Sequence, residues 1–116
     1  MASNLKKPTK AGLHRKADPF VLIFMALGEP MRLRIMELLP REPNCAEMYN
    51  VVELAAELKI SQPTVSHHLK TLHVAGLVKS RRQCNSVYFY TDVCAIENWL
   101  RETERRLGIP APNLLS

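Results

Sequence analysis

Three cysteines, Cys45, Cys84 and Cys94, and the adjacent pair His67 and His68 are the residues best suited to metal binding or covalent chemistry. Thiolate and imidazole groups bind metals, and both can act in catalysis. The cysteines have no CxxC or CxC spacing, and their odd number argues against a disulfide framework and against a zinc knuckle. This cysteine usage is typical of a reducing compartment, so we expect a cytoplasmic protein.

The two histidines do not form a predicted metal site. Neighbouring residues on a helix are about 100° apart, whereas two ligands on one helix need a spacing of three or four residues. No nucleophile, base and orienting carboxylate are grouped in the sequence, so no enzymatic activity is expected. The pair must therefore be interpreted from the helix that carries it.

Length and charge suggest one small basic domain. The chain has 116 residues and a net charge of +5, which favours polyanionic partners. Residues 1–17 carry basic but no acidic side chains and are expected to be a flexible tail. Residues 18–108 form the predicted domain, and residues 109–116 a C-terminal tail. A flexible basic tail could also contact phosphates.

The first predicted helix is strongly apolar. Asp18 is a suitable N-cap and Pro19 a suitable first residue for a helix over residues 20–27, which Gly28 ends. The run FVLIFMAL follows basic residues as in a signal peptide, but it has only eight residues and no A-x-A cleavage site. It is also too short to span a membrane. We expect a helix that is covered on several sides.

Four further elements follow with clear boundaries. A second helix runs from Pro30 to Pro40, and the segment REPNCAEMY after it has no period and is expected to be a loop. Asn50 and Glu53 predict a capping box for a third helix. Ser61 is the predicted N-cap of a fourth helix, which ends at Gly76. The short turn between the third and fourth helices predicts a helix-turn-helix.

The hydrophobic period changes after Gly76. The segments LVKSRR and SVYFY predict a β-hairpin around the turn QCNS, in which Asn85 is expected to adopt the left-handed conformation. A last helix from Asp92 has an apolar seam that suits another helix. The predicted fold class is mainly α with a small β-hairpin, a winged helix-turn-helix of about five helices and a two-stranded wing.

The fourth helix has a core face and a polar face. Val65, Leu69 and Leu72 point to the core, and His68 lies at the edge of this stripe. His67 faces outward with polar and basic side chains that suit base edges and phosphates. The alternative is an ordinary solvated helix surface.

Residues 20–107 resemble the ArsR/SmtB family of bacterial winged-helix repressors. The matching stretch is VVELAAELKISQPTVSHHLKTLHVAGLVKSRRQCNSVYFY, and LGEPMRLRIMELL resembles the family's second helix. The resemblance implies a homodimer that binds double-stranded operator DNA, a pseudo-palindrome with half-sites about 34 Å apart. It also implies repression that an inducer relieves.

The resemblance assigns roles to particular residues of this sequence. The DNA-contacting positions would be Ser61, Gln62, Thr64, Ser66, His67 and Lys70, with Arg81 and Arg82 on the wing. The dimer interface, from the first and last helices, would include Phe20, Phe24, Val93, Ile96, Leu100 and Leu107.

The family's common metal sites are incomplete in this chain. Asn50 and Val52 stand where many relatives have the cysteines of a C-x-C site on the third helix. Asp92 and Cys94 stand at the first half of a zinc site of the last helix, but Arg105 and Gly108 stand at the second half. A complete site of either type is not expected.

The cysteines leave two alternatives open. Cys94 lies in the first turn of the last predicted helix, where the helix dipole favours a thiolate. Cys84 is about 20–30 Å away along the predicted strand, whereas Cys45 could approach Cys94 if its loop folds over the dimer interface. The cysteines either form a switch for arsenite, antimonite, a persulfide or an oxidant, or they are inert and the ligand is unknown or absent.

A second class of function is also compatible with the sequence. The chain could be a winged-helix protein-interaction module, or a thiol redox or metal-buffering protein, that does not recognise a DNA sequence. Such a protein would depend little on Lys70, Arg81 and Arg82.

Overall fold

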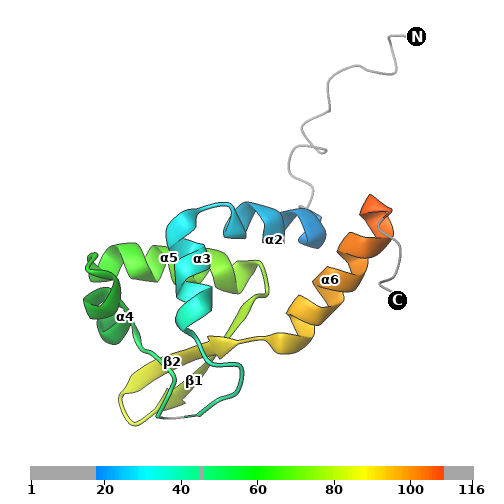
Figure 1. Cartoon of the computed structure of the whole chain (residues 1–116). Coiled ribbons are helices and arrows are strands. Elements are labelled where there is room, and N and C mark those ends of the chain that lie inside the picture. The colour runs from blue at the N-terminus through cyan, green and yellow to red at the C-terminus, as the bar shows by residue number, and fades with distance from the viewer. Residues whose placement is uncertain (1–17, 45, 109–116) are drawn as a thin grey trace, which may run out of the picture.

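The computed structural model describes residues 18–44 and 46–108, which form five α-helices and one two-stranded antiparallel sheet (Figure 1). This architecture confirms the predicted fold class. The elements in chain order are α2 (Pro19–Leu27), α3 (Pro30–Leu38), α4 (Val51–Leu58), α5 (Gln62–Val74), β1 (Val78–Gln83), β2 (Ser86–Thr91) and α6 (Val93–Leu107).

Local side-chain caps begin the helices where the sequence predicts. Asp18 Oδ1 accepts a hydrogen bond from the backbone N–H of Phe20 at 2.9 Å. Asn50 and Glu53 form the complete capping box at the start of α4. These bonds satisfy backbone donors that a helix leaves unpaired in its first turn, and so fix the entry points of α2 and α4.

The core lies between α3, α4, α5 and the first residues of the wing. Its largest fully buried side chains are Ile35, Leu54, Val65, Leu72 and Leu77. Two of them, Val65 and Leu72, belong to α5, which also contacts α2, α3, α4 and β1. The orientation of α5 is therefore set from several directions.

The loop between α3 and α4 is tied to the wing. The N–H of Phe89 donates to the carbonyl of Tyr49 at 2.9 Å, and the N–H of Thr91 donates to the carbonyl of Pro40 at 2.8 Å. Tyr49 thereby adds an isolated bridge beside β2. The sequence predicts only a loop here, because a single bridging residue has no detectable period.

The hairpin turn has a different geometry from the prediction. The left-handed residue in this turn is Cys84, with φ 54°, and not Asn85. The strands pair over Val78–Gln83 and Ser86–Thr91, so Cys84 and Asn85 form a two-residue turn. A cysteine at positive φ is strained, because its Cβ crowds the backbone in this region.

Helix α2 packs on α3 and α5 as well as on α6, and α6 contributes the partly buried Ile96 and Trp99 to the edge of the core. Only Ile23 and Ala26 of α2 are buried, and α6 has no buried residue. Val21, Phe24 and Met25 are exposed, so the expected cover over several sides of α2 is not met within one chain. Figure 1 shows α6 running from the end of β2 towards the start of α2, on the side of the molecule away from α4.

An aromatic and ionic cluster joins α2 to α6. The rings of Phe24 and Trp99 are 5.0 Å apart in an edge arrangement, and the Arg106 guanidinium lies 4.5 Å over the ring of Phe20. Arg106 also donates to Asp18 Oδ2 at 2.8 Å. In the described part of the chain, no helix is long and apolar enough to cross a membrane.

Candidate nucleic-acid interface

A tight turn places α5 against α4. Lys59 caps α4 in the left-handed conformation, with φ 58°, and the N–H of Ile60 donates to the carbonyl of Ala55. Helix α5 then begins at Gln62 after the N-cap Ser61. The two helices and this turn form the predicted helix-turn-helix.

The faces of α5 agree with the helical phase deduced from the sequence. Val65, Leu69 and Leu72 are buried, and His68 is also buried, with 9% exposure. The opposite side of the helix is open to solvent. The exposed predicted residues are Ser61, Gln62, Thr64, Ser66, His67 and Lys70.

The exposed residues of α5 differ in how free their side chains are. Ser61 Oγ accepts from the N–H of Thr64 at 3.3 Å and is 2.8 Å from Thr64 Oγ1. These hydroxyls therefore have local partners. Within the described residues, Gln62, Ser66 and Lys70 form no side-chain hydrogen bond or ion pair, so their polar groups are available to a partner.

Arg32 of α3 anchors the buried side of α5. Its Nη1 lies 3.2 Å from His68 Nδ1, and its Nε donates to the carbonyl of Ala26 at 2.7 Å. Because a guanidinium only donates, Nδ1 of His68 must accept and the ring is neutral. Burial lowers the pKa of His68 below its ordinary value, which also favours the neutral ring.

The sequence does not predict the role of Arg32, which it places only on the polar face of α3. The one available signal is its position just after a helix end. The last carbonyls of α2 need donors, and a basic side chain in the next turn can supply them.

The two wing arginines lie on opposite faces of the hairpin. Arg81 pairs with Tyr88, and Arg82 pairs with Val87. Paired residues of an antiparallel sheet share a face, and successive residues alternate. Arg81 therefore lies with Tyr88, and Arg82 with Val87 on the face that carries Phe89. Both arginines are exposed.

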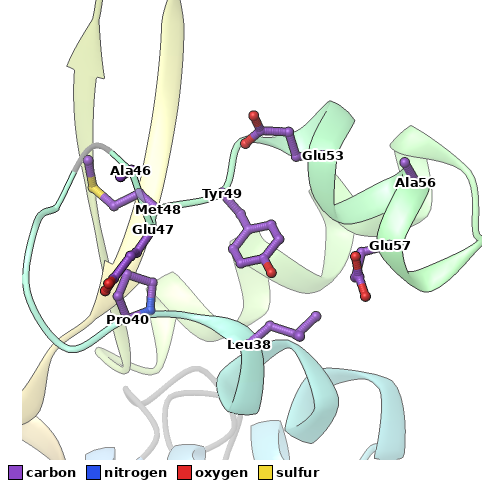
Figure 2. Close-up of a pocket in the computed structure, with 9 residues that line it drawn as sticks. All are labelled: Leu38, Pro40, Ala46, Glu47, Met48, Tyr49, Glu53, Ala56 and Glu57. Carbon is purple, nitrogen blue, oxygen red and sulfur yellow. The ribbon is translucent and has the colours of Figure 1, made fainter.

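A hollow beside α4 has the opposite charge. Figure 2 shows Glu53 and Glu57 projecting from α4 near Tyr49, with Glu47 on the preceding loop. Its volume is about 760 Å³. Three carboxylates would repel a phosphate backbone, so this hollow does not belong to a nucleic-acid surface.

The cysteines are not assembled into a site in the described residues. Cys84 and Cys94 are both exposed and free, in the hairpin turn and the first turn of α6. Cys45 lies outside the described residues. In the described ranges, no group of three His, Cys, Asp or Glu side chains could hold a metal ion.

Comparison with known sequences gives related regulators. Residues 29–80 match the family model described as a bacterial regulatory protein of the arsR family. The transcriptional repressor SmtB homolog of Synechocystis sp. is 37% identical over 92 residues, covering 79% of this chain and 66% of the relative. An uncharacterized HTH-type transcriptional regulator of Methanocaldococcus jannaschii is 41% identical over 68 residues, covering 59% and 72%.

An arsenic-related protein is among the relatives. The arsenic resistance transcriptional regulator ArsR1 of Pseudomonas putida is 35% identical over 68 residues. The match covers 59% of this chain and half of that relative's length.

Solved structures have the same fold. An ArsR-like transcriptional regulator from a Rhodococcus species superposes with a TM-score of 0.67 at 23% identity, covering 78% of this chain and 80% of the other. A homodimeric winged helix-turn-helix domain from Mycobacterium bovis, a possible ArsR-family regulator, has a TM-score of 0.58 at 24% identity and coverages of 95% and 92%.

The fold and the exposed polar face of α5 define a DNA-binding winged helix-turn-helix protein. The sequence relatives identify the family within this class. The chain belongs to the ArsR/SmtB family of transcriptional regulators, which are not enzymes.

Proposed function

We propose that the protein is a homodimeric repressor that binds a palindromic operator and releases it when an inducer binds. The observation that carries this proposal is the face of α5, where Gln62, Ser66 and Lys70 are exposed and have no partner in the described part of the chain. Amide and hydroxyl groups pair with base edges in the major groove, and an ammonium group pairs with phosphate.

The remaining contacts follow from the same surface. His67 lies beside Lys70 on the outward side of α5 and is a candidate base or phosphate contact. Ser61 and Thr64 are candidate contacts through the start of the helix, where backbone N–H groups favour phosphate. Arg81 and Arg82 would bind the flanking backbone, one from each face of the wing.

Homodimer formation is supported by the exposed apolar surface of the terminal helices. Phe24, Leu100 and Leu107 are each more than 40% exposed in the single chain. Large apolar side chains gathered on two adjacent helices are typical of a protein–protein interface. Phe20, Val93 and Ile96 are partly buried and would complete the predicted interface.

A thiol switch is the finer part of the proposal. Cys94 is exposed in the first turn of α6, within the segment expected to form the dimer. A modified thiol there could therefore change the distance between the α5 helices of the two subunits. The arsenic-resistance relative supports arsenite or antimonite as candidate ligands; a persulfide donor or an oxidant would act on the same thiol. Cys45 and Cys84 are the other candidates.

The DNA-binding proposal is tested by comparing the upstream DNA of the gene with random duplex over a salt series. We expect tight binding to the upstream DNA that weakens steeply with salt. Gln62→Ala should reduce the preference for that DNA more than it reduces binding to random duplex. Equal affinity for both DNAs at every salt concentration would exclude sequence-specific recognition.

The thiol proposal has a separate test. Operator binding is measured with and without arsenite or a persulfide donor for the wild type and for Cys45→Ser, Cys84→Ser and Cys94→Ser. Release of the wild type but not of Cys94→Ser supports a switch at Cys94. A response that is unchanged from the wild type in all three variants would eliminate thiol sensing.

A further inference from the structure

A groove with one basic end separates α2 from the outward half of α5. Its volume is about 370 Å³, within the range of roughly 300–1,000 Å³ that small-molecule sites occupy. Its walls are apolar and come from Leu22 and Met25 of α2 and Val74 of α5. Met25 and Val74 are each more than 60% exposed, although both are large apolar side chains.

The other end of the groove is formed by three basic side chains, Arg32, His67 and Lys70. No carboxylate lines the groove among the described residues, and Lys70 has no ion-pair partner there. The guanidinium of Arg32 bonds to His68 and to the carbonyls of Ala26 and Met25, and it forms no ion pair among the described residues. The groove thus combines an apolar wall with a basic end that no carboxylate lines among the described residues.

We propose that this groove binds a small amphipathic organic anion, with its hydrocarbon part against Leu22, Met25 and Val74 and its acid group at Arg32, His67 and Lys70. Apolar burial supplies affinity, and charge complementarity sets the orientation. A ligand with a hydrocarbon part but no acid group, or with an acid group but no hydrocarbon part, would occupy only half of the site.

Such a ligand would compete with DNA. This consequence rests on the proposed function, because His67 and Lys70 are also proposed DNA contacts. A carboxylate bound to Lys70 removes one phosphate contact from α5, and the hydrocarbon part of the ligand occupies the space beside this helix. Binding of the anion and of DNA must then weaken each other to the same extent.

The test uses octanoate and the full chain without DNA. Calorimetric titrations compare octanoate with octanol, which lacks the acid group, and with acetate, which lacks the long hydrocarbon part. We expect saturable binding of octanoate alone, with one molecule per subunit. Met25→Gln and Val74→Gln should weaken it about tenfold or more, which corresponds to about 1.4 kcal/mol. The matched control, Val52→Gln, changes an apolar residue of α4 that is more than half exposed and lies outside the groove, and it should bind as the wild type does.

A second measurement separates this site from the proposed function. Octanoate should dissociate operator DNA from the wild type and from Val52→Gln, but at much higher concentration from Met25→Gln, which retains normal DNA affinity. If the protein has no sequence-specific DNA binding, the proposed function fails while the titration without DNA still decides whether the groove binds the anion.

Three results would overturn the proposal. The first is that octanoate does not bind saturably, and the second is that octanol binds equally well. The third is that Met25→Gln and Val74→Gln bind octanoate like the wild type. Sedimentation of the same variants tests another occupant. If Met25→Gln or Val74→Gln dissociates a dimer that Val52→Gln preserves, the groove is covered by a second copy of the chain and not by a small anion.

Discussion

Substituting Arg32 by methionine should destabilise the protein by removing the contact that ties α3 to the end of α2 and to α5. The variant keeps the length of the aliphatic side chain but loses its donors to the Ala26 carbonyl at 2.7 Å and to His68 Nδ1 at 3.2 Å. A hydrogen bond from a charged group contributes about 1.5–3 kcal/mol, and the lower value applies because this site is partly exposed. Two such bonds at the lower value predict a loss of about 3 kcal/mol.

The matched control is Arg34→Met on the same helix. Arg34 forms an ion pair with Glu37 at 3.7 Å, and both side chains are more than half exposed. A surface pair of this kind contributes less than about 0.5 kcal/mol. The control therefore removes the same charge from α3 without removing a link between helices.

Thermal and urea unfolding followed by circular dichroism provide the measurement, at one fixed protein concentration because dimer formation affects the midpoint. For a domain of this size, the expected loss lowers the midpoint of Arg32→Met by roughly 10–20 °C, against a few degrees for the control. Equal midpoints for the two variants would refute the assignment of Arg32 as an anchor of α5.

Three further predictions concern single residues. Because burial lowers the pKa of His68, the folded state binds fewer protons than the unfolded state. The free energy of unfolding therefore keeps the full contribution of His68 above the unfolded pKa of about 6.5 and decreases as the pH drops below it. His68→Asn keeps an acceptor for Arg32 and should lose less stability than the wild type in urea titrations from pH 7.5 to 5.5; an equal loss would assign the pH dependence to other groups. Cys84→Gly should raise the free energy of unfolding by up to about 1 kcal/mol, since glycine accepts a positive φ, while Cys84→Ser should not, and equal stabilities would contradict the strain. Asn50→Ala should cost about 1 kcal/mol by removing the cap of α4, whereas Glu57→Ala, at an exposed position of the same helix, should cost little; a similar loss in both would show that the cap adds nothing.

Interactions within a few residues could be predicted from the sequence, and distant ones could not. Asn50 and Glu53 are three residues apart, so their types and spacing alone predict the capping box. The helical phase of α5 likewise separates His67 from His68. Both are local consequences of helix geometry, which does not depend on the rest of the fold.

The contacts that the sequence does not indicate join distant parts of the chain. Arg32 and His68 are 36 residues apart, and on a helical projection Arg32 resembles any solvated basic residue. The bridge between Tyr49 and Phe89 involves a single residue on one side, so it leaves no alternating pattern. The φ of Cys84 depends on how the strand register closes the turn, for which Asn85 is the better candidate by residue preference alone.

The Asp18–Arg106 ion pair also determines how the domain responds to mechanical force. Because this bond joins the start of α2 to the end of α6, a force applied between these two residues loads the junction of the helices and not the core. We expect the ion pair to rupture first, and α6, which packs on the core only through partly buried side chains such as Ile96 and Trp99, then to detach turn by turn. Its 15 residues extend to about 50 Å before the force reaches α3, α4 and α5. Optical-tweezers records should show this extension before the main unfolding event, and a single event would mean that α6 is held as firmly as the core.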